Sequence, residues 1–91
     1  MATVDLKPRV IKFIKTLPPK QQRQIKGSLL ALKENPLPHD SKKLVGYEYY
    51  RRTDAREYRI IYQYNEEQAM VVVVLVGKRN DGEVYKIVKR L

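Results

Sequence analysis

The sequence predicts an α+β protein whose elements follow the order strand, two helices, three strands and a terminal helix. Apolar residues repeat with the period of a helix between residues 8 and 34, whereas they alternate or run continuously, as in β-strands, between residues 57 and 76. The length of 91 residues, without a break in composition, predicts one domain over residues 1–91. A domain of this size has room for one sheet and a few helices around a small core.

Two helices are predicted in the N-terminal part of the chain, after a short alternating segment, Thr3–Leu6, that is expected to be an edge strand. Pro8 suits the first turn of the first helix, whose apolar stripe consists of Val10, Phe13, Ile14 and Leu17. Pro18 disfavours helical geometry in the residue before it, so a second helix is predicted from about Pro19 to Glu34. Its buried stripe consists of Ile25, Leu29 and Leu32. The short link between the helices predicts an antiparallel helical hairpin.

A β-hairpin is predicted in the second half of the chain. The first strand, Glu57–Tyr64, alternates, so its tyrosines are expected on one face and Arg59 on the other. The second strand, Met70–Val76, is apolar throughout and mostly β-branched, which predicts a strand covered on both faces inside the sheet. Residues 65–68 are short and polar, as in an antiparallel hairpin connection.

Three further segments complete the predicted organisation. Residues 35–40 contain two prolines and are predicted to be a loop. A strand is predicted from Tyr47 to Arg52 or Thr53, before the hairpin. After the turn at residues 80–82, a short C-terminal helix is predicted over Glu83–Leu91, because its apolar residues repeat at helical spacing.

The chain is strongly basic, with 19 Lys and Arg against 10 Asp and Glu and a net charge of +9. Such a charge on a small domain is typical of nucleic-acid binding, although the same field would attract an acidic protein partner. The absence of cysteine excludes disulfides and suits a reducing compartment. No apolar stretch approaches the roughly 20 residues of a membrane span. We therefore expect a soluble, cytoplasmic protein without a membrane partner.

Metal sites and nucleotide cofactors are not predicted. The one histidine, His39, stands in a proline-rich loop without the cluster of ligands that a metal needs. The four glycines are isolated, so neither a dinucleotide fingerprint nor a phosphate-binding loop is present. The carboxylates gather in turns and at strand ends among cations, where solvated ion pairs are their ordinary role.

Several motifs in a fixed order resemble a known family. They are Lys43-Leu44-Val45-Gly46, Glu57-Tyr58-Arg59-Ile60-Ile61-Tyr62, and Val76-Gly77-Lys78-Arg79 followed by Glu83-Val84-Tyr85. With the Leu17-Pro18-Pro19 break, the Asn35-Pro36 loop and the closing Val88-Lys89-Arg90-Leu91, the chain resembles the RelE family of bacterial and archaeal toxins over nearly its whole length. This resemblance implies a RelE-like, microbial ribonuclease-type fold: a small antiparallel sheet with the helical hairpin packed on one face, the other face left for a ligand.

The resemblance also implies an activity, that of a ribosome-dependent endoribonuclease belonging to a toxin–antitoxin pair. Such enzymes cleave mRNA in the ribosomal A site by attack of the RNA 2′-hydroxyl on its own phosphate, without a metal or other cofactor, and so inhibit translation. Carried over by position, the catalytic residues are Arg59, Arg79 and Tyr85, with a cation from the preceding strand. Arginine forks suit a phosphate under attack, whereas Tyr85 could be a base, a proton shuttle or a stacking platform. The implied partners are the 70S ribosome, mRNA and a RelB-like antitoxin in a hetero-oligomer.

The adjacent residues Arg51 and Arg52 depart from the family pattern, in which two cations often occupy alternate strand positions. Neighbours on a regular strand point to opposite faces, so only one of the two can face the site. Counting back from Arg59 favours Arg52 as the catalytic residue and puts Tyr50 where a second cation is often found. Slower or differently tuned activity is expected as a result.

Additional contacts to RNA are expected near the site and on the helices. The residues are Tyr50, Arg51, Lys78, Lys12, Lys20, Arg23 and Lys26. The helix cations are equally compatible with an ordinary solvated surface. Two other functions stay open: a ParE-like toxin that inhibits DNA gyrase and needs no arginine–tyrosine site, and a basic RNA-binding module whose catalysis is weak or lost through Tyr50.

Overall fold

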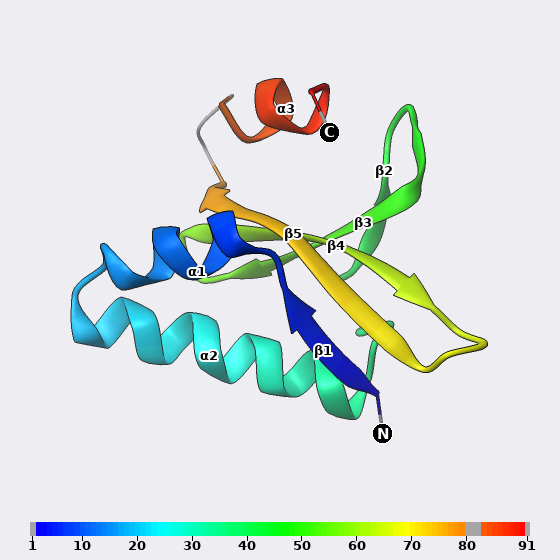
Figure 1. Ribbon diagram of the computed structural model, residues 1–91, viewed down its shortest axis with the longest axis horizontal. Coiled ribbons are helices and arrows are strands. Elements are labelled where there is room, and N and C mark those ends of the chain that lie inside the picture. Colours follow the sequence, from blue (N-terminus) through cyan, green and yellow to red (C-terminus); the bar gives the residue numbers. More distant parts are fainter. Residues whose placement is uncertain (1, 80–82, 91) are drawn as a thin grey trace.

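In this computed structural model, the protein consists of a five-stranded β-sheet with helices on both faces (Figure 1). The structure describes residues 2–79 and 83–90, without the side chains of Glu48 and residues 83–85. In chain order the elements are β1 (Thr3–Leu6), α1 (Pro8–Lys15), α2 (Pro19–Glu34), β2 (Lys42–Leu44), β3 (Tyr47–Ala55), β4 (Tyr58–Asn65), β5 (Met70–Lys78) and α3 (Glu83–Val88). The α+β class predicted from the sequence is confirmed, with β2 as a strand that was not expected.

The strand order is β1-β5-β4-β3-β2. Strands β2 to β5 pair antiparallel, but β1 runs parallel to β5, with Thr3 beside Met70. The prediction of an antiparallel sheet is therefore wrong for β1, and the sheet is mixed. A tight hairpin forces its two strands to run antiparallel, whereas β1 reaches β5 only after the helices and three other strands. No local pattern in the sequence encodes that direction.

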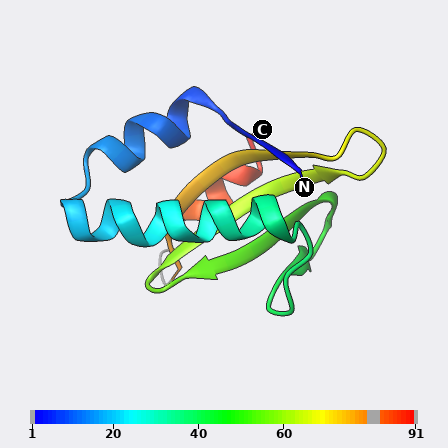
Figure 2. The ribbon, with the colours of Figure 1, turned by 90° about the horizontal axis from the view of Figure 1, so that it is seen from below.

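The helical hairpin packs on one face of the sheet, which we call the helix face (Figure 2). The predicted stripe of α2 is confirmed, since Ile25, Leu29 and Leu32 are buried. In the predicted stripe of the first helix, Val10 is buried, whereas Phe13, Ile14 and Leu17 are partly buried against the same cluster and Leu17 lies beyond the end of α1. They pack against the tyrosines and apolar side chains of β4 and β5 that alternate onto this face. The amphipathic pattern of the two helices is thus explained by burial against the sheet.

The opposite face, which we call the α3 face, carries the C-terminal helix (Figure 1). A bulge between Ile61 and Tyr62 leaves Val74 without a partner on β4, so that Val74 and Leu75 both join the cluster beneath α3. Val88 is buried in this cluster. The expectation that this face is left to a ligand therefore needs correction, because α3 covers part of it.

Side-chain hydrogen bonds from Arg51, Thr53 and Tyr62 hold the loop between α2 and β2 against the sheet. The hydroxyl of Tyr62 donates to the carbonyl of Pro36 at 2.8 Å, and the hydroxyl of Thr53 donates to Asp40 Oδ2 at 2.9 Å. Arg51 Nη2 donates to Ser41 Oγ at 3.1 Å. These bonds tie residues 36–41 to β3 and β4, the two strands that carry the candidate site on their other side.

Candidate active site

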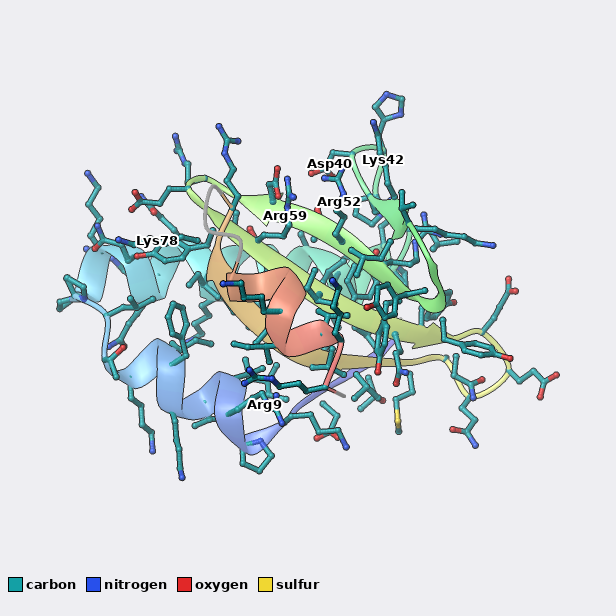
Figure 3. All side chains as sticks on the ribbon, turned by 90° about the horizontal axis from the view of Figure 1, so that it is seen from above. Arg9, Asp40, Lys42, Arg52, Arg59 and Lys78 are labelled. Carbon is teal, nitrogen blue, oxygen red and sulfur yellow. The ribbon has the colours of Figure 1, made fainter. Side chains whose placement is uncertain are left out.

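The pairing of β3 with β4 brings three charged side chains onto the α3 face. Arg52 faces Ile61 across the strands and Asp54 faces Arg59, and directly opposed residues of an antiparallel pair share a face. Because Ile61 belongs to the cluster beneath α3, Arg52 and Arg59 lie on that face as well. Figure 3 shows both arginines on the sheet surface beside α3.

Asp54 lies between two of the arginines predicted to be catalytic. Its Oδ1 accepts a hydrogen bond from Nε of Arg59 at 2.9 Å, and Nη2 of Arg59 donates to its Oδ2 at 3.4 Å. The same Oδ2 is 3.8 Å from Nη1 of Arg79. One carboxylate thus faces two guanidinium groups, of which Arg59 is held by two contacts and Arg79 by a longer ion pair.

Arg79 reaches this position because the chain is still held to the sheet where β5 ends. Its backbone N–H donates to the carbonyl of Glu57 at 2.9 Å, which extends the β4–β5 ladder by one bond. Its side chain is 49% exposed, compared with 15% for Arg59 and 27% for Asp54. In this surface cluster Arg59 is therefore partly buried, whereas Arg79 is more accessible.

This arrangement is chemically suited to a phosphate. Guanidinium groups bind carboxylates and phosphates with the same paired hydrogen bonds, so arginines that hold a carboxylate are also suited to hold a phosphate. The cluster carries an excess of positive charge, because it contains three arginines and one carboxylate: Arg52, Arg59, Arg79 and Asp54. Charge of this kind, fixed before the ligand arrives, stabilises negative charge that develops during a reaction.

Tyr50 also lies toward the α3 face, as counted from the sequence, but it belongs to a structural cluster. Its ring centroid is 6.0 Å from that of Tyr47, and both rings pack around the residues beneath α3. Tyr50 further lines an apolar hollow of about 470 Å³ together with Gln63, Val74 and the start of α1. The position at which the resemblance implies a second cation is thus half-buried packing here.

Two residues predicted near the site are directed elsewhere. Arg51 faces Tyr62, a residue of the helix face, and its guanidinium donates to Ser41. Lys78 is opposite Tyr58, another residue of the helix face, and Figure 3 shows it away from Arg52 and Arg59. Neither residue joins the arginine cluster.

The helix cations also lie apart from the arginine cluster. Lys12, Lys20, Arg23 and Lys26 are exposed on α1 and α2. These helices pack on the helix face, whereas the arginines lie on the α3 face. Any contact of the helix cations with RNA would therefore involve a different part of that RNA from the one held by the arginines.

Tyr85 falls within α3, but its side chain lies outside the described residues.

Two residues of the α3 face were not predicted from the sequence. Asp54 could have been found by the count that selected Arg52, since it is two positions further along the same strand. Lys42 faces Arg52 from β2, and it was missed because that strand was not predicted (Figure 3).

Two general features of the described part of the chain bear on the class of site. Among its side chains, no group of three or more His, Cys, Asp and Glu residues is placed to hold a metal ion. None of its helices is both long enough and apolar enough to cross a membrane.

Comparison with known proteins identifies the class to which this fold and site belong. Residues 4–82 match the family model described as the ParE toxin of the type II toxin–antitoxin system parDE. The mRNA interferase toxin RelE of Escherichia coli (strain K12) is 33% identical, over 97% of this chain and 95% of its own.

Solved structures agree with this assignment. A doubly substituted E. coli RelE toxin in the free state has a TM-score of 0.78 and 33% identity, covering 100% of this chain and 99% of its own. The toxin in the intact E. coli RelBE complex has a TM-score of 0.73 and 29% identity, covering 86% of this chain and 96% of its own. The chain therefore belongs to the RelE family of type II toxins, within the wider group that also contains ParE.

Proposed function

We propose that the protein is the toxin of a toxin–antitoxin pair and acts as an endoribonuclease that cleaves mRNA on the ribosome. The observation that carries this proposal is the convergence of Arg59 and Arg79 on one carboxylate, on the sheet face that also presents Arg52. Similarity to the mRNA interferase RelE over almost the full length of both chains supports the same activity.

The reaction is an internal transesterification of RNA. The 2′-oxygen forms a bond to the adjacent phosphorus as the bond from phosphorus to the 5′-oxygen breaks. The 2′-hydroxyl loses its proton and the leaving 5′-oxygen gains one, which gives a 2′,3′-cyclic phosphate and a 5′-hydroxyl. Arg59 and Arg79, with Arg52, stabilise the negative charge that grows on the non-bridging oxygens, the largest contribution that a protein makes to such a step.

Arg52 is proposed to serve the phosphate, whereas Arg51 is not. We expect Arg52→Ala to lower the cleavage rate by about 10- to 100-fold, because it removes a charge that faces the reacting phosphate. Arg51→Ala is expected to change the rate by less than about 3-fold, because its guanidinium is directed to Ser41. The measurement is cleavage of mRNA on programmed ribosomes, with thermal unfolding of both variants as the control. Equal losses of cleavage rate in the two variants would contradict the assignment of Arg51 and Arg52 to opposite faces of the sheet.

Tyr85 is proposed to act through its hydroxyl, as a base or a proton shuttle. Tyr85→Phe keeps the ring and is then expected to be as damaging as Tyr85→Ala, each by about 10²- to 10⁴-fold in the single-turnover rate. A stacking role would instead leave Phe nearly active and Ala inactive. Wild-type activity in both variants would exclude any role of Tyr85 in the reaction.

The proposed partners follow from this activity. A basic toxin that cleaves mRNA has to be neutralised, and RelE toxins of solved structure form complexes with RelB antitoxins. We propose a RelB-like antitoxin as the partner in a hetero-oligomer, and the 70S ribosome and mRNA as targets in the cytoplasm. The net charge of +9 favours partners that are acidic or carry phosphates.

The experiment that tests the proposed function is to induce the protein in cells and map the ends of mRNA on translating ribosomes. Cuts in phase with codons, with 5′-hydroxyl ends, are expected. Growth arrest with intact mRNA and inhibited DNA gyrase would favour the ParE-like alternative. Binding of RNA without cuts or growth arrest would favour a non-catalytic RNA-binding module.

A further inference from the structure

Asp54 is the feature of the arginine cluster that the proposed reaction does not use. A carboxylate beside a phosphate-binding site repels the phosphate, so its presence among three arginines needs a physical reason. Its contacts supply one, because both carboxylate oxygens face the Nε–Nη2 edge of Arg59, at 2.9 and 3.4 Å. Two contacts between two planar groups fix the rotation of the guanidinium as well as its position.

The two arginines are held to different degrees. Arg59 and Asp54 are 15% and 27% exposed, so their contact is partly shielded from water and stronger than a surface ion pair. Arg79 is half exposed, and 3.8 Å is too long for a hydrogen bond. Asp54 therefore fixes Arg59 firmly and attracts Arg79 to the same point without locking it there.

Asp54 should affect catalysis and binding in opposite directions. Displacing a reacting or stabilising group by about 1 Å can cost on the order of 100-fold in rate. Removing one negative charge from a cationic surface strengthens binding to RNA by only a few-fold at moderate salt, because each phosphate contact contributes modestly. Of the two effects, positioning is the larger.

We propose that Asp54 is a positioning residue, which aligns the guanidinium of Arg59 and draws that of Arg79 toward one point before the phosphate binds. This inference rests on the proposed function. It assigns Asp54 no contact with the reacting atoms. Its effect is transmitted through Arg59, and a lower affinity for RNA is the cost of that alignment.

The test compares Asp54→Ala and Asp54→Asn with the wild type in single-turnover cleavage on programmed ribosomes. Asp54→Ala is expected to lower the maximal rate by about 10- to 100-fold, while the half-saturating concentration stays equal or falls. Asp54→Asn keeps one acceptor for Nε of Arg59 and is expected to lie between Ala and the wild type. Glu66→Ala makes the same change of charge in the β4–β5 turn, at the other end of the sheet, and is expected to leave both parameters unchanged.

A second measurement does not depend on activity. In the wild type the Nε–H of Arg59 is expected to give a protected NMR signal, which Asp54→Ala removes and Asp54→Asn partly keeps. Asp54→Asn has nearly the same shape as the wild type, so it provides the test if the alanine variant fails to fold. Cleavage by both variants at or above the wild-type rate would overturn the role of Asp54 alone. A wild type that leaves mRNA on ribosomes intact would overturn the proposed function itself.

Discussion

Cleavage by Arg59→Ala and Arg79→Ala is expected to fall by roughly 10²- to 10³-fold, the usual effect of losing one preorganised donor to a developing negative charge. Both guanidinium groups face the carboxylate that marks the site, and neither belongs to the apolar clusters of the core. The maximal rate of mRNA cleavage on programmed ribosomes measures this loss directly.

A matched control is available on α1. Lys15→Ala also removes one positive charge, from an exposed position on the helix that packs on the opposite face of the sheet. It is expected to weaken binding slightly and to leave the maximal rate unchanged. If Arg59→Ala and Arg79→Ala behave like Lys15→Ala, the arginine cluster has no part in the reaction.

Tyr62→Ala is expected to lower the free energy of unfolding by about 3–5 kcal/mol, which is typical of removing a fully buried aromatic side chain. Tyr62 is 0% exposed and lies in the core between the sheet and the helical hairpin. A domain of this size has only about 5–15 kcal/mol of stability in total. Urea denaturation, followed by circular dichroism, measures the change.

The hydroxyl of Tyr62 can be tested separately. Tyr62→Phe keeps the ring but leaves the carbonyl of Pro36 without this donor, and it is expected to cost about 1 kcal/mol. The loop at residues 36–41 should exchange its amide hydrogens faster in this variant. A loss as large as that of the alanine variant would mean that the loop bond, and not core packing, dominates the contribution of Tyr62.

The sequence predicts those features that depend on local periodicity. The helical stripes identify Val10, Ile25 and Leu29 as buried, and strand alternation places Arg52 and Arg59 on one face. Both patterns follow from fixed backbone geometry, with about 3.6 residues per turn of a helix and 2 residues per repeat of a strand. They can therefore be recognised without knowing which element each helix or strand packs against. The motifs that resemble the RelE family extend these local predictions to a fold.

Features that depend on distant pairing could not be predicted in the same way. The parallel direction of β1 and the bulge beside Ile61 both arise from contacts between strands. Asp54 was treated as one of several solvated carboxylates, because its importance depends on Arg59 and Arg79, which arrive from β4 and the end of β5. A carboxylate gains a specific role only from the neighbours that folding brings to it.

The place of β1 beside β5 governs when the protein can assemble during its synthesis. Strand β1 leaves the ribosome first but cannot pair until β5 has been made, since Thr3 pairs with Met70. Closing so long a loop is unfavourable until the intervening chain has folded. Arg79 follows β5 directly, so the arginine cluster is also completed only after β5 has been made. A nascent chain thus has neither its full sheet nor its arginine cluster until β5 and Arg79 have been made.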